Sequence, residues 1–79
     1  MIARQVELLT NKRNEKLIML REKKGKSQAE AARQIGISQP MLAMLESGDR
    51  RGGDSTKVKV AQYYGASVDD IFFANNYHS

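Results

Sequence analysis

The stretch from residue 27 to residue 48, SQAEAARQIGISQPMLAMLESG, decides the fold. Ser27 is a good N-cap, because its hydroxyl can accept a hydrogen bond from a free backbone N–H of the first helical turn. Glu30 follows three residues later and completes a capping box. A helix is therefore predicted over Gln28–Ile35, and Gly36 ends it because glycine adopts the left-handed conformation without a steric penalty.

A second helix is predicted over Gln39–Ser47. Ser38 is its N-cap, and Pro40 is tolerated because the N–H groups of the first turn have no partner within the helix. Leu42 and Leu45 lie on its inner face. Two short helices joined by a tight glycine turn indicate a helix-turn-helix, although the same periodicity also fits an ordinary helical hairpin.

Length and composition restrict the remaining possibilities. A chain of 79 residues predicts one small domain with a small core. It contains no cysteine, which excludes disulfides and cysteine-ligated metal sites and fits a reducing cytoplasm. No apolar run approaches the roughly 18 residues of a membrane span. Thirteen basic residues against nine acidic ones give a net charge of +4, which favours a polyanionic partner.

Sequence motifs of catalysis are absent. The chain has no GxxxxGK loop, no HExxH pair and no nucleophile elbow. Its single histidine, His78, forms neither a metal site nor a catalytic triad. The sequence therefore predicts a protein that is not an enzyme and that needs no cofactor, metal or small-molecule ligand.

Two segments of the chain, in this order, resemble the corresponding motifs of one protein family. The segment REKKGKSQAEAARQIGISQPMLAMLESG at residues 21–48, followed by GASVDDIF at residues 65–72, is similar to the Cro and phage-repressor type, the XRE family of bacterial regulators. The resemblance covers about residues 15–73. It implies an all-α, five-helix, lambda-repressor-like domain at residues 14–73 that binds DNA in the cytoplasm, followed by a frayed tail at 74–79.

The first helix of the domain is expected at Glu15–Lys24, with Asn14 as its N-cap. The N-terminal extension, residues 1–13, lies outside the family's minimal domain. Three interpretations are open for it: a sixth helix packed on the domain, a helix that pairs with a second copy, or a frayed arm. The helical interpretations depend on three apolar residues at helical spacing, Ile2, Val6 and Leu9.

Two helices are expected after the glycine-rich segment. The first covers Thr56–Tyr64, is capped by Ser55 or Asp54, and directs Val58 into the core. The second is capped by Ser67 and carries acidic residues in its first turn, where the helix dipole favours negative charge. The resemblance also implies that Arg21 pairs with Glu46 near the end of the second helix of the motif, as a structural contact.

The candidate DNA contacts follow from the residue types. In such a domain the second helix of the motif, here Gln39–Ser47, is the recognition helix, whose N-terminal residues reach base edges in the major groove. Of its outward side chains, Gln39 can form two hydrogen bonds with a base, and adenine suits it best. Arginine side chains beside glycines suit phosphate oxygens. The predicted base contacts are Gln39, Pro40, Met41 and Met44. The predicted phosphate contacts are Gln28, whose role the resemblance implies, together with Ser38, Arg50, Arg51 and Lys57.

Two functions from different classes are consistent with these residues. The first is a repressor that binds double-stranded DNA as a homodimer on a two-fold operator. The second is a protein-interaction module of antitoxin or anti-repressor type that keeps the fold. Met41 and Met44 motivate the second, because members of the family usually carry polar or basic residues there and methionines recur at protein-binding surfaces.

Overall fold

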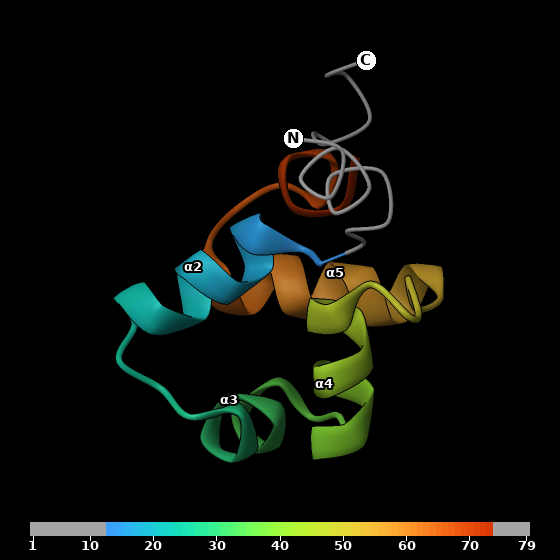
Figure 1. Ribbon diagram of the computed structural model, residues 1–79. Coiled ribbons are helices and arrows are strands. Elements are labelled where there is room, and N and C mark those ends of the chain that lie inside the picture. The colour runs from blue at the N-terminus through green and yellow to red at the C-terminus, as the bar shows by residue number, and fades with distance from the viewer. Residues whose placement is uncertain (1–12, 74–79) are drawn as a thin grey trace, which may run out of the picture.

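The computed structural model describes residues 13–73. This part of the chain forms four α-helices and one π-helix and contains no strand, so the predicted all-α fold is confirmed (Figure 1). The predictions for the N-terminal segment before Arg13 and for the tail lie outside the described residues. The elements are α2 (Glu15–Lys23), α3 (Gln28–Ile35), α4 (Gln39–Ser47), α5 (Asp54–Tyr64) and η1 (Asp69–Phe73).

Three of the helices begin where a polar side chain caps them. The Asn14 carboxamide accepts from the backbone N–H of Leu17 at 3.0 Å. Ser27 and Glu30 form the reciprocal capping box, and the Ser38 hydroxyl accepts from Met41 N–H at 3.2 Å. These caps satisfy donors that the helix itself leaves unpaired, so the predicted starts of α2, α3 and α4 are confirmed.

The start of α5 differs from the prediction. The helix begins at Asp54, two residues early, and its N-cap is Gly53, which forms no side-chain capping bond. The prediction that Ser55 or Asp54 caps this helix is therefore wrong. The chain turns at Gly52, whose φ is +76°, and Asp54 then occupies the first turn, where its negative charge complements the helix dipole.

The core receives side chains from every helix. The alanines of α3 are small enough to let neighbouring helices approach closely. The buried apolar residues are Leu17, Ala31, Ala32, Ile35, Leu42, Leu45, Val60, Ala61 and Ile71. Val58, which was expected to point inward, is 45% exposed. Residues two apart lie on nearly opposite sides of a helix, so the burial of Val60 turns Val58 outward.

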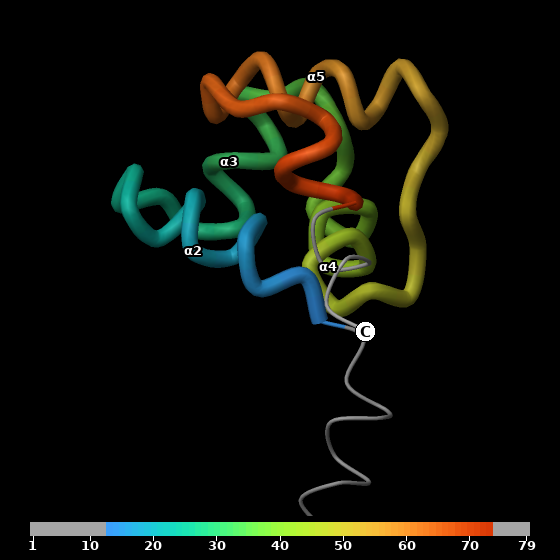
Figure 2. Tube along the Cα trace, turned by 90° about the horizontal axis from the view of Figure 1, so that it is seen from above, coloured from blue at the N-terminus to red at the C-terminus, as the bar shows by residue number. Residues whose placement is uncertain are grey.

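The helices are arranged so that α3 and α4 lie at one end of the domain and η1 at the other (Figure 1). The view from above shows α5 crossing over α3 and η1 folding back beside α2 (Figure 2). Asn14 joins three of these elements. Its carboxamide donates to the Ile71 carbonyl at 3.0 Å, and its backbone N–H donates to the Glu46 carbonyl at 2.8 Å. The end of α4 is thereby fixed relative to α2 and η1.

The last element follows its predicted N-cap, Ser67, but it is a π-helix and not an α-helix. The Ser67 hydroxyl accepts from Asp70 N–H at 3.0 Å, as expected of an N-cap. The residues that follow form the π-helix η1, which places Ile71 in the core. No helix within residues 13–73 combines the length and apolar character that a membrane crossing requires.

Candidate nucleic-acid interface

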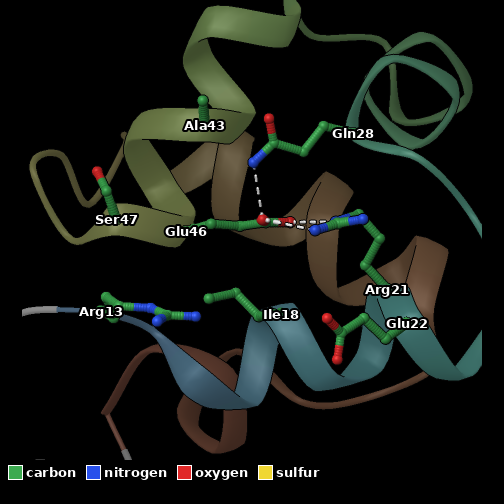
Figure 3. Close-up of a pocket in the computed structure, with 8 residues that line it drawn as sticks. All are labelled: Arg13, Ile18, Arg21, Glu22, Gln28, Ala43, Glu46 and Ser47. Carbon is green, nitrogen blue, oxygen red and sulfur yellow. Dashed lines mark hydrogen bonds and ion pairs between the residues drawn. The ribbon is translucent and has the colours of Figure 1, made fainter.

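A buried carboxylate holds the helix-turn-helix together. Glu46 of α4 is 3% exposed and accepts from Arg21 Nε at 2.7 Å and from Arg21 Nη2 at 3.2 Å. The Gln28 amide donates to the same carboxylate at 2.9 Å. Figure 3 shows the three side chains converging from α2, α3 and α4. This geometry satisfies the buried charge, as a buried ion pair requires.

Arg21 also fixes the segment between α2 and α3. Its Nη1 donates to the Lys26 carbonyl at 2.9 Å. The hydrogen bond with Glu46, together with that residue's negative charge, raises the pKa of Arg21 despite its partial burial, so the guanidinium is always charged. The position and angle of α4 therefore depend on contacts that reach back to α2.

Gln28 has a structural role that the sequence did not indicate. Its amide was expected to donate to a phosphate, and in the structure it donates to Glu46. An amide carries two N–H hydrogens, and Gln28 is half-buried at the first residue of α3. One of these hydrogens therefore positions α4.

The outer face of α4 is the candidate base-reading surface. Leu42, Leu45 and Glu46 are buried against the rest of the domain. The opposite side presents a stripe at the i, i+3, i+4, i+7 spacing of a helix, with exposed residues at the start of α4 and half-buried ones after it. The residues of this outer face are Gln39, Pro40, Ala43, Met44 and Ser47.

Met41 is placed differently from its expected outward position. Its side chain is half-buried and packs against the core. Position 41 lies one helical turn before the buried Leu45 and next to the buried Leu42, so it borders the inner face. Met44 is also half-buried, but it is not among the residues that pack against the core cluster. Only one of the two methionines thus belongs to the outer face of α4.

The two arginines follow the C-terminal end of α4. Arg50 and Arg51 are exposed, and the Arg50 backbone N–H donates to the Met44 carbonyl at 3.2 Å, which ties this segment to the helix. A helix of this length spans about 13 Å, comparable to the roughly 12 Å width of the major groove. Gln39 at one end and the arginines at the other can therefore contact a base edge and a groove wall together.

The other two predicted phosphate contacts lie in different places. Ser38 is exposed at the start of α4, and its oxygen caps the helix while its O–H remains a donor. The Lys57 ammonium lies 5.0 Å from the ring centre of Phe73 and 6.0 Å from that of Phe72. It therefore makes cation–π contacts with η1, which lies at the end of the domain opposite α3 and α4 (Figure 1).

A cleft of about 300 Å³ lies between α2 and α4 beside this surface (Figure 3). Arg13 lines it next to Ala43 and Ser47, and its guanidinium also contacts Glu15 at 3.5 Å. Sequence spacing could not reveal this neighbourhood, because Arg13 and α4 are about 30 residues apart. Within residues 13–73, no group of three or more His, Cys, Asp or Glu side chains is arranged to hold a metal ion.

Comparison with known proteins identifies one match. The family model described as helix-turn-helix matches residues 17–71, which include most of α2, all of α3, α4 and α5, and the start of η1. No curated protein matches the chain, and no solved structure does. The matched region contains the Arg21–Glu46 pair, the whole outer face of α4 and both arginines.

Proposed function

The chain belongs to the XRE-type helix-turn-helix family of DNA-binding regulators, and from this premise we propose that it is a repressor that binds a two-fold symmetric operator as a homodimer. The observation that carries the proposal is the outer face of α4, which begins with the exposed Gln39 and ends beside Arg50 and Arg51. In the helix-turn-helix, the N-terminal residues of the second helix contact base edges in the major groove.

Each contact has its own role in this proposal. Gln39 forms a pair of hydrogen bonds with a base, and adenine fits its amide best. Pro40 and Met44 make van der Waals contacts with base edges, whereas Met41, which packs against the core, does not. The phosphate contacts are made by Gln28, Ser38, Arg50 and Arg51, and they supply the salt-dependent part of the affinity.

A dimer follows from the small number of contacts that one domain offers. A single α4 carries one side chain that can form a bidentate base contact, which is too little for a tight and specific complex. Two copies related by a two-fold axis contact two half-sites about 34 Å apart, one turn of the DNA helix. The bound dimer then represses by occupying DNA that the polymerase needs.

The exposure of the methionines favours DNA over a protein partner. The protein-interaction interpretation was motivated by two methionines on the outer face of α4, and one of them, Met41, packs against the core. The exposed large hydrophobic residues of the described part are Met19 and Val58, which lie on α2 and α5. The outer face of α4 therefore lacks the extended apolar patch typical of a protein interface.

The test is a selection of bound sequences from random duplex DNA at about 0.15 M salt, where non-specific binding is already weak. We expect an enriched motif with two-fold symmetry and half-sites one helical turn apart. Enrichment of a single unrepeated half-site overturns the dimer but leaves DNA binding intact. Binding without enrichment that vanishes as salt rises overturns sequence-specific recognition.

A further inference from the structure

The middle of the outer face of α4 has no free hydrogen-bonding side chain. Pro40, Ala43 and Met44 are apolar, and Pro40 also lacks a backbone N–H. Ser47, next along the stripe, has its hydroxyl 3.0 Å from the Asp49 carboxylate and 3.1 Å from the Met44 carbonyl. The side chain that can donate to a base is therefore Gln39, at the start of the helix.

An apolar surface in the major groove discriminates among bases by a simple rule. Thymine presents a C5-methyl group beside its O4 acceptor, whereas the groove edges of adenine, guanine and cytosine present only donors and acceptors. Removing those polar groups from water without a partner costs free energy, and burying a methyl group gains it. An apolar helix face therefore favours a C5-methyl pyrimidine over the other bases.

We propose that Pro40, Ala43 and Met44 form a methyl-reading patch that recognises the C5-methyl group of pyrimidines in each half-site. This inference rests on the proposed function and adds the chemical class that the helix recognises. The occupant is a DNA base and not a protein, because the patch lies between the amide of Gln39 and the cationic side chains of Arg50 and Arg51, which suit a groove with phosphate walls.

The patch also predicts where the methyl group lies. Ala43 and Met44 are four and five residues after Gln39, so they are about 6–8 Å further along the helix axis. The recognised methyl group therefore lies on a different base from the one that Gln39 contacts. Thymine and 5-methylcytosine carry the same methyl group at this position of the groove, so the patch accepts either base.

The first experiment removes single methyl groups from the selected site. Each thymine is replaced in turn by deoxyuridine, which lacks the methyl group and keeps the same hydrogen bonds. Binding should weaken about fourfold per contacted methyl, the equivalent of one buried CH₂ group, at one or two positions per half-site and at no thymine in the flanks. Replacing a sensitive thymine–adenine pair by cytosine–guanine should weaken binding, and methylating that cytosine at C5 should restore part of it.

The second experiment assigns the effect to α4. In Met44→Gln, the methionine is replaced by a polar side chain of similar length, so the loss of affinity on uracil substitution should become smaller. Met19→Gln is the matched control, because Met19 is 46% exposed on α2 and should leave the uracil effect unchanged. Thermal unfolding checks both variants, and Ala43→Ser replaces Met44→Gln if the latter does not fold.

The outcomes separate this inference from the function on which it rests. Failure to enrich any motif removes the proposed function itself. An enriched motif without thymine in the half-site, or one that tolerates uracil at every position, overturns the methyl-reading patch and leaves the DNA-binding function intact. Uracil sensitivity that persists unchanged in Met44→Gln and in Ala43→Ser also overturns the patch, because other residues then make the contact.

Discussion

Glu46 shows how one residue can determine the geometry of the site. A carboxylate with 3% of its surface exposed loses most of its hydration and must be compensated by charge and hydrogen bonds. Arg21 supplies two of these bonds and Gln28 the third. Because the three residues come from α4, α2 and α3, satisfying this one charge also fixes the angle between the helices.

Removing the arginine should therefore be costly. Arg21→Met leaves the buried carboxylate with only the Gln28 amide, and we expect it to lower the free energy of unfolding by about 3–5 kcal/mol in urea denaturation. Lys16→Met is the control, since Lys16 contacts the half-exposed Asp70 at 3.2 Å and should cost less than about 1 kcal/mol. Similar losses in the two variants would contradict the structural importance of the pair.

A second substitution keeps this prediction testable if Arg21→Met does not fold. Replacing both partners by methionine removes the buried charge together with its counter-charge, and such apolar replacements are often neutral. The double variant Arg21→Met, Glu46→Met should therefore be more stable than Arg21→Met alone. A double variant that is less stable than the single one would show that the carboxylate is not the source of the loss.

Tyr64 should make the stability of the folded domain decrease at alkaline pH. Its hydroxyl is buried without a hydrogen-bond partner among the described residues. Burial, assisted by the negative charge of Glu46, raises the pKa of Tyr64 to about 12, whereas the pKa in the unfolded chain is about 10. The folded state thus holds the phenolic proton more tightly, and this contribution to stability is lost as pH rises from about 10 to 12.

Tyr64→Phe isolates that contribution. At neutral pH we expect the variant to be within about 1 kcal/mol of the wild type, because the hydroxyl that it removes is unpaired. Above about pH 11 the wild type should lose on the order of 1 kcal/mol more than the variant, measured as the change in urea midpoint from pH 9. Parallel pH profiles for the two proteins would show that Tyr64 does not titrate abnormally.

At the scale of elements, the turn between α4 and α5 is held by glycines with different requirements. Gly52 has a φ of +76°, and a Cβ there would lie 3.2 Å from side-chain carbons of both Leu45 and Thr56. Gly53, the N-cap of α5, has an extended backbone with φ of −82°, and a Cβ would meet nothing within 4 Å. One glycine is needed for the turn, and the other leaves the helix uncapped.

These two positions should respond to substitution in opposite directions. Gly53→Ser supplies the missing capping hydroxyl and should stabilise the domain by roughly 0.2–0.5 kcal/mol. Gly52→Ala forces a side chain into a left-handed backbone and a close contact, and should destabilise it by about 1–2 kcal/mol. Thermal unfolding of both variants measures this, and a loss of stability in Gly53→Ser would contradict the observed start of α5.

At the scale of the whole molecule, the prediction separates the base contact of Gln39 from the phosphate contact of Arg51. Gln39→Ala should weaken binding to the selected operator by about 1–3 kcal/mol and leave random DNA nearly unaffected. Arg51→Ala should weaken binding to both DNAs and reduce the slope of log affinity against log salt by about one. Titrations at several salt concentrations measure both quantities.

Lys23→Ala is the matched control for these titrations. Lys23 is an exposed cation at the last residue of α2, and in Figure 1 that end of the helix points away from the segment that joins α4 to α5. Its removal should change neither the operator affinity nor the salt slope. An equal loss in Lys23→Ala and Arg51→Ala would indicate that net charge alone, and not the position of the arginine, governs binding.

The sequence by itself determined the local structure and the family. Asn14, Ser27 and Ser38 each accept from an N–H group three residues away, so each helix start depends only on neighbours in the chain. The helical spacing of Leu42 and Leu45 likewise identified the buried face of α4. The same local reasoning located Gln39 and the two arginines on exposed positions. It was wrong at α5, where Asp54 suits either a cap or a first turn.

Only the tertiary structure decided which side chains meet. Gln28 and Glu46 are 18 residues apart, and their contact exists only after α3 and α4 have packed. The Arg21–Glu46 pair spans 25 residues and was expected from the family resemblance, not from residue spacing. The same packing turned Met41 toward the core, turned Val58 to solvent and placed Lys57 over the rings of η1. Residue spacing defines the face of one helix, but the partner of that face depends on how all the helices share a single core.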